Sequence, residues 1–160
     1  LFKGLYSGMS SKEAKKEFKD NKGTYQNVEV GLYNWEIKQK NLSFEDDVLV
    51  GISFHYNNYF STSENQTILN NTKLFFENLG YKTFYEDEFW SNSENFDSQW
   101  GLVLLSPDNL KVAHIYPKPY FLLGEFLGFS PGLIIYDYSK FGLNLNQLES
   151  LSPNKEDSGF

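Results

Sequence analysis

Residues 61–80 read STSENQTILNNTKLFFENLG, and this stretch decides the fold class. Its apolar positions, counted from Ile68, follow the i, i+4, i+7, i+11 spacing of one helix face. They are Ile68, Leu69, Thr72, Phe75, Phe76 and Leu79. Ser61–Glu64 matches a capping box at the start of the helix, and Gly80 suits the position just past its end. The stretch therefore predicts an amphipathic helix that must cover another apolar layer.

Strand-like segments lie on both sides of this helix. Before it, β-branched and aromatic residues alternate over 28–32, 33–37 and 48–56; after it they do so over 81–89, 101–106, 111–116 and 133–138. Turn signals at residues 106–109 and at Ser130-Pro131-Gly132 set off the later strands. A first helix opens at the capping box Ser10–Glu13 and ends between Asn21 and Gly23. We predict an α+β fold, an antiparallel sheet of six or seven strands with two helices on one face.

The order of helix and then three strands occurs twice. Residues 8–57 and 61–117 can be laid over each other as a tandem α-β-β-β repeat, in which both helices end in Asn-x-Gly. Chance similarity in a chain rich in Lys, Asn and Phe is the alternative. With 160 residues in all, we expect one domain over residues 1–149 and a flexible acidic tail over 150–160.

The composition excludes several functional classes. The chain has 14 lysines and no arginine against 21 acids, a net charge of −7, which argues against a nucleic-acid partner. Cysteine is absent, so disulfides and thiolate metal sites are impossible. No window is apolar enough for a membrane helix, and we expect no membrane insertion. The first residues do not form a signal peptide, and whether an export or lipid signal precedes Leu1 stays open. We expect a cytoplasmic protein, with a periplasmic or envelope-anchored location as the alternative. The oligomeric state stays open.

Catalytic patterns are weak. Residues 128–132 match the nucleophile-elbow pattern G-x-S-x-G, but Pro131 lacks the N–H that the oxyanion hole needs, so a Pro-Gly turn is the simpler interpretation. His55 and His114 lie in predicted strands without metal-ligand spacing. No glycine-rich phosphate loop occurs. We expect no enzyme, no metal and no cofactor, with a small enzyme using carboxylates and a histidine as the second alternative.

One stretch, residues 86–100, mixes acids with large aromatic residues. Protein interfaces use this mixture, because aromatic residues anchor the partner and charge steers its approach. Together with a second acidic turn, the candidate partner-binding residues are Glu86, Asp87, Glu88, Trp90, Glu94, Asp97, Trp100, Asp46 and Asp47. The alternative is that the aromatic residues belong to the core and the acids only face solvent.

Residues 4–14, GLYSGMSSKEA, resemble the G-M-[ST]-x-x-E opening of small envelope domains with a helix-then-strands layout. These domains include the outer-membrane assembly lipoproteins and, as tandem repeats, the β-lactamase inhibitor proteins. The chain departs from them because it has neither a lipidated cysteine nor disulfides. The resemblance implies a non-catalytic domain whose sheet binds another protein.

Charge and aromatic content together favour an inhibitor. We expect a bacterial immunity protein that neutralises a basic toxin domain, such as a nuclease, because an acidic and aromatic surface mimics the polyanion that the toxin binds. An envelope lipoprotein or assembly factor is the alternative.

Overall fold

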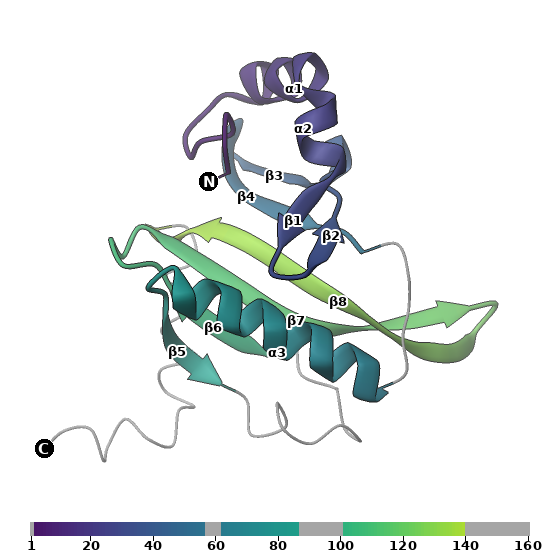
Figure 1. Cartoon of the computed structure of the whole chain (residues 1–160). Helices are drawn as coiled ribbons and strands as arrows, with labels where there is room; N and C mark the ends of the chain where they lie inside the picture. Colours follow the sequence, from purple (N-terminus) through teal and green to yellow (C-terminus); the bar gives the residue numbers. More distant parts are fainter. Residues whose placement is uncertain (1, 57–61, 87–100, 140–160) are drawn as a thin grey trace, which may run out of the picture.

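The computed structural model describes residues 2–56, 62–86 and 101–139. The helices are α1 (Ser11–Asp20), α2 (Lys22–Gln26) and α3 (Thr62–Asn78), with a short 3₁₀ turn, η1, at Gln39–Asn41. The strands are β1 (Val28–Val30), β2 (Tyr33–Trp35), β3 (Leu42–Glu45), β4 (Val48–Phe54), β5 (Lys82–Glu86), β6 (Leu102–Leu105), β7 (Lys111–Leu122) and β8 (Glu125–Asp137). In Figure 1, helices α1 and α2 come before strands β1–β4, and helix α3 comes before strands β5–β8.

Six strands form one antiparallel sheet in the order β3-β4-β8-β7-β6-β5, so the predicted fold class is confirmed. The last strand, β8, lies between β4 and β7 and joins the two halves of the chain. Two details of the predicted strands are wrong. β1 and β2 pair only with each other, and residues 42–45, which lie outside the predicted strands, form the edge strand β3. The tandem repeat stays a prediction.

Helix α1 begins as predicted. The Ser10 hydroxyl accepts a hydrogen bond from the Glu13 N–H at 3.3 Å, and the Glu13 carboxylate accepts one from the Ser10 N–H at 3.0 Å. The predicted end between Asn21 and Gly23 is confirmed, since α1 ends at Asp20 and Asn21 is its C-cap. Gly23 is not the capping glycine, however, because it lies in a second short helix, α2, which runs to Gln26. This extra turn places Tyr25 in the core, where it is fully buried.

Helix α3 ends as predicted. Gly80 takes a φ of +87°, and the Tyr81 N–H donates to the Phe76 carbonyl at 3.0 Å, which closes a Schellman motif. Most of the predicted apolar face is buried, but Leu79 is 54% exposed and Asn65 takes a place on the buried stripe instead. Ser61, the first residue of the predicted capping box, lies outside the described residues.

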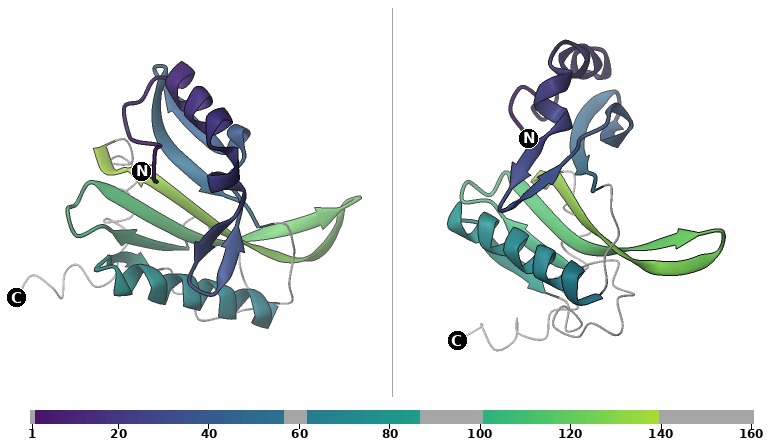
Figure 2. Two further views of the ribbon diagram at one scale, coloured as in Figure 1. Left: turned by 45° about the horizontal axis from the view of Figure 1, so that its top comes forward. Right: turned by 45° about the vertical axis from the view of Figure 1, so that its right-hand side comes forward.

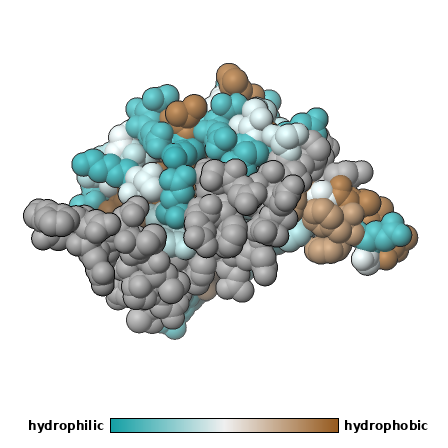
Figure 3. All heavy atoms as spheres, turned by 90° about the horizontal axis from the view of Figure 1, so that it is seen from below, coloured by the Kyte–Doolittle hydropathy of each residue, from teal (hydrophilic) through white to brown (hydrophobic). Residues whose placement is uncertain are grey.

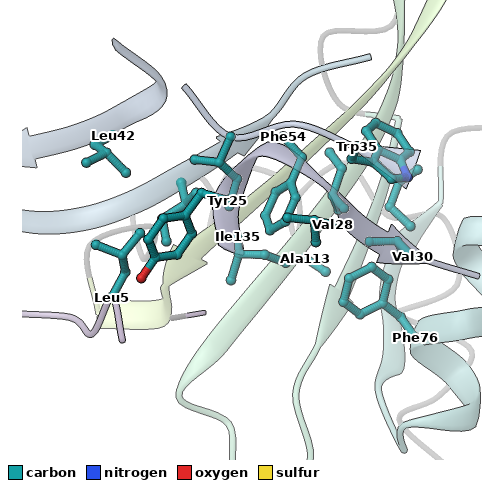
Figure 4. Close-up of a cluster of buried hydrophobic side chains, with 14 of the residues drawn as sticks. Leu5, Tyr25, Val28, Val30, Trp35, Leu42, Phe54, Phe76, Ala113 and Ile135 are labelled. Carbon is teal, nitrogen blue, oxygen red and sulfur yellow. The ribbon is translucent and has the colours of Figure 1, made fainter. Parts of the chain in front are cut away.

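One hydrophobic core joins the helices to the sheet. It contains Phe18 from α1, Phe76 from α3 and the sheet residues Ile52, Ala113 and Ile135, so both long helices cover the same face. Figure 4 shows this cluster, with side chains from α2, the β1–β2 hairpin and the sheet pointing toward one another. Because a single cluster spans the described segments, the elements stabilise one another as one packed unit.

Strands β7 and β8 continue far beyond their neighbours. β6 pairs with β7 only up to Ile115, and β4 pairs with β8 only from Leu133 onward. Residues 117–131 therefore form a two-stranded ribbon, which we call the arm, and which projects from the sheet in Figures 1 and 2. The predicted Pro-Gly turn at 130–132 is wrong, since these residues pair within β8, with Pro131 opposite Pro117.

Candidate functional site

The structure places the predicted partner-binding residues apart. Asp46 and Asp47 form the turn between β3 and β4, whereas Glu86 is the last residue of β5. Strands β3 and β5 are the opposite edges of the sheet. Glu86 is engaged with Lys73 of α3 at 3.5 Å. The other six residues, Asp87, Glu88, Trp90, Glu94, Asp97 and Trp100, lie outside the described residues.

Residues 7–11 bring other acids to the β3–β4 turn. The Ser7 hydroxyl donates to the carboxylate of Asp137 at the end of β8, and the Ser11 hydroxyl donates to the carboxylate of Asp47. Asp108 lies in the turn between β6 and β7, next to the pairing of Lys111 with Asp137. We call the set Asp46, Asp47, Asp108 and Asp137 the acidic end.

Hydrogen bonds fix the Asp108 carboxylate in its turn. It accepts from the Ser106 hydroxyl at 2.6 Å and from the Leu110 N–H at 3.0 Å, and these two donors hold the pKa of Asp108 below its ordinary value. The predicted turn at residues 106–109 is confirmed by a 2.9 Å hydrogen bond from the Asn109 N–H to the Ser106 carbonyl. The carboxylate therefore stays ionised and exposed over a wide pH range.

A cleft of about 430 Å³ opens beside Asp108 and Asp137. Its walls are Ser7, the β6–β7 turn with Lys111, and residues 137–139. Two apolar side chains lie here, Leu110 at 66% exposure and Tyr138 at 38%. The cleft thus offers carboxylates and apolar contacts together, which suits a protein side chain entering from a partner.

The two histidines do not form a joint site. In the pairing register, Ser53 of β4 lies opposite Ile134 of β8, which lies opposite His114 of β7. His55 follows β4, so the two histidines belong to strands about 10 Å apart. Partial burial, followed by the charges of Lys38 and Lys118, lowers the pKa of His55. Within the described ranges no cluster of three or more His, Asp or Glu could hold a metal ion.

The arm carries the densest group of exposed apolar side chains. Of the eleven large hydrophobic residues exposed in the described part of the chain, five lie within residues 120–126. They are Tyr120, Phe121, Leu122, Leu123 and Phe126, and Leu123 is 98% exposed. In the space-filling view of Figure 3, they form the brown protrusion at the right-hand edge. Soluble monomers seldom expose apolar residues this densely without a binding role.

Two lysines lie on either side of His55 near the base of the arm. Glu36 forms a bridge with His55 and pairs with Lys38 at 3.5 Å, while Lys118 lies opposite Ser130, whose hydroxyl donates to the carbonyl of the neighbouring Tyr56. Lys38 also lines a second groove, of about 420 Å³, together with Lys19 and Lys22. The first 40 residues carry eight lysines against five acids, whereas residues 41–160 carry six lysines against sixteen acids. The lysine excess therefore lies in the first 40 residues of the sequence, and the acidic excess lies in the rest.

The comparisons with known proteins give no family. No family model matches the chain, and no curated protein or solved structure matches it. Among the described helices, none has the length and apolar content to cross a membrane.

Sequence reasoning missed three parts of these sites: Asp108 with Asp137, the lysines at the base of the arm, and the arm itself. The first two are assembled from distant segments, so that only strand pairing could reveal them. The arm did have a signal in the sequence, the apolar run 120–127, which is interrupted only by Gly124 and Glu125, but the prolines next to it disfavour a strand.

Proposed function

We propose that the protein is a non-catalytic inhibitor that binds and neutralises a basic protein, as a bacterial immunity protein neutralises a toxin domain. The observation that carries this proposal is the acidic end, where three separate segments bring four aspartates to one end of the sheet. A lysine-rich or arginine-rich partner surface matches this end by charge.

The charge of the chain supports fast association with such a partner. Residues 41–160, which include the whole acidic end, carry a net charge of −10, against +3 for the first 40 residues. Surfaces of this kind raise association rates by about 10–10³-fold at low salt, because the long-range field steers the partner before contact. An inhibitor that must act before its target does damage depends on this rate.

The cleft next to Asp108 and Asp137 supplies the short-range contact. Its exposed Leu110 and Tyr138 provide apolar area, and an arginine or lysine entering between them would meet the Asp137 carboxylate. Such a charged pair, flanked by apolar contacts, is the arrangement found at interface hot spots.

The first part of the test is to find the partner. Affinity capture from the source cells should yield a stoichiometric basic protein that arrests growth when expressed alone, and co-expression of this chain should restore growth. Failure to find any basic partner whose toxicity this chain relieves would overturn the proposal.

The second part is a matched set of variants. The triple variant Asp46→Asn, Asp108→Asn, Asp137→Asn removes three charges but keeps side-chain oxygens that can accept the turn hydrogen bonds. We expect its association rate to fall at least about tenfold at low salt. The control Asp20→Asn, Glu29→Gln, Glu77→Gln changes the net charge equally but outside the acidic end. Equal rates for the two triple variants would refute the assignment of the site.

A further inference from the structure

The arm is built to expose apolar side chains at its tip. Leu123 and Gly124 form a two-residue turn between the paired residues Leu122 and Glu125, and both have positive φ, +51° and +81°. This conformation suits the pair Asn-Gly and disfavours leucine. Leu123 nevertheless occupies it and is 98% exposed, so its side chain gains nothing from the fold. Strain without a folding benefit points to a function for this side chain.

The arm is also protected against pairing with another strand. Pro117 lies opposite Pro131, and because neither has an N–H, this pair cannot be a hydrogen-bonded one. The backbone groups at these positions, and at Pro119 two residues on, therefore point to the outer edges of the ribbon. Two consecutive outward positions of β7 thus lack a donor. Whatever the arm binds, it contacts through side chains and not by strand addition to β7.

One face of the arm carries a row of aromatic rings. The ring centroids of Phe121 and Phe126 are 5.7 Å apart, and those of Phe126 and Phe129 are 5.0 Å apart, both in edge-to-face geometry. Phe129 is buried at the inner end, while Phe121 and Phe126 are 59% and 52% exposed. These contacts stiffen the arm, so that its tip is presented with little loss of conformational freedom.

Cations lie behind this apolar tip. Lys118 is exposed within the arm itself, five residues before Leu123, which corresponds to about 16 Å along the strand. Lys118 lies opposite Ser130, whose hydroxyl donates to the carbonyl of Tyr56 at 3.3 Å, next to His55. His55 in turn bridges Glu36, which pairs with Lys38 at 3.5 Å, and Lys40 follows two residues on. Glu125 lies next to the turn at the tip. An apolar tip with lysines behind it matches an anionic lipid surface.

We propose that the arm docks the protein on the surface of an anionic membrane, with Leu122, Leu123, Phe121 and Phe126 inserted at the interface, Lys118 nearest to the lipid headgroups, and Lys38 and Lys40 farther back. Insertion by about 5–10 Å, typical of interfacial elements, leaves Lys118 about 6–11 Å from the surface. That distance is close to the Debye length of about 8 Å in physiological salt, so the attraction persists there. The contact is shallow and needs no membrane-spanning segment.

The test is co-sedimentation of the full chain with phosphatidylcholine vesicles, with and without phosphatidylglycerol. We expect binding that is stronger to the anionic vesicles and that weakens as salt is raised. Leu123→Asn should lower the partition at least about tenfold, because a leucine is lost from the lipid contact. Lys118→Glu should lower it about tenfold or more on anionic vesicles and little on neutral ones.

Matched controls separate this result from damage to the fold. Leu32→Asn replaces a leucine that is 82% exposed in the β1–β2 turn, and Lys82→Glu reverses an exposed lysine at the start of β5. Both should bind vesicles like the wild type. Absence of vesicle binding, equal binding to both vesicle types, or binding that is insensitive to Leu123→Asn would each overturn the proposal.

A second copy of the chain is the competing occupant. If sedimentation equilibrium shows a dimer that Leu123→Asn dissociates, and the protein does not bind vesicles, the arm is a self-association element and the lipid proposal is wrong. The outcome does not depend on the inhibitor function, because partner binding at the acidic end is measured without vesicles.

Discussion

The substitution Leu123→Asn should stabilise the folded protein. A leucine in the left-handed region costs about 1–2 kcal/mol, and asparagine recovers part of this because its side chain tolerates positive φ. Since Leu123 is 98% exposed, replacing it removes almost no buried apolar area. We therefore expect a gain of about 0.5–1 kcal/mol in the free energy of unfolding, or roughly 1–4 °C in Tm.

Urea unfolding followed by circular dichroism measures this gain, with the slope m expected to stay unchanged. Leu32→Asn is the control, because Leu32 also lies in a two-residue hairpin turn and is 82% exposed, but only its neighbour Gly31 has positive φ there. The control should show no gain. A Leu123→Asn protein that is less stable than the wild type would refute the reasoning, since it would show that Leu123 makes a contact within the fold.

Three further predictions concern the body of the protein. Burial and a 2.9 Å hydrogen bond to Glu17 raise the pKa of Tyr25 to about 12. The stability that this tyrosine contributes is complete below pH 10 and should be lost as the pH rises from 10 to 12. In alkaline unfolding titrations the variant Tyr25→Phe should show a smaller loss, and at neutral pH it should be less stable than the wild type by about 1 kcal/mol. Gly51→Ala should destabilise the fold by about 1–3 kcal/mol in urea unfolding, because the new Cβ would lie 2.7 Å from the ring of Tyr136 on the paired strand. An unchanged midpoint would show that this ring moves freely. Asn65 is fully buried, and among the described residues neither of its amide atoms has a hydrogen-bond partner. Asn65→Leu should therefore raise the free energy of unfolding by about 1–3 kcal/mol, and a loss would show that the amide is paired in solution.

The helices could be read from the sequence because their signals are local. The capping box Ser10–Glu13 and the glycine at position 80 both determine a helix end through contacts within a few residues. The short helix α2 after Asn21 was not predicted, and its cause is tertiary. Gly23 lies in this helix, whose turn buries Tyr25 against Phe18, with stacked rings 5.2 Å apart. Burial of an aromatic side chain here outweighs the low helix propensity of glycine.

The arm and the acidic end could not be read in this way. Proline disfavours a strand, and only the pairing register shows that Pro117, Pro119 and Pro131 occupy outward positions where no ladder hydrogen bond is lost. Asp108 and Asp137 are almost thirty residues apart, and they meet only because Lys111 pairs with Asp137. The acidic and aromatic stretch 86–100 remains a prediction beyond Glu86, since its other residues lie outside the described ones.

The two proposed surfaces lie at opposite ends of the same strand pair, and this separation makes a last prediction. The acidic end adjoins Lys111 at the start of β7, and the tip of the arm follows Leu122 at its end, on the order of 35 Å away along the strand. That is several Debye lengths, so an anionic membrane at the tip would neither repel the acidic end nor cover it.

The effects of variants at the two ends should therefore be independent. Leu123→Asn should leave the association rate with a basic partner unchanged, the acidic-end triple variant should leave vesicle binding unchanged, and the combined variant should show both losses without coupling. Vesicle binding and partner association measured on all three proteins test this. A partner rate that falls with Leu123→Asn would mean that the arm and the acidic end serve one interface, and the division into two surfaces would be wrong.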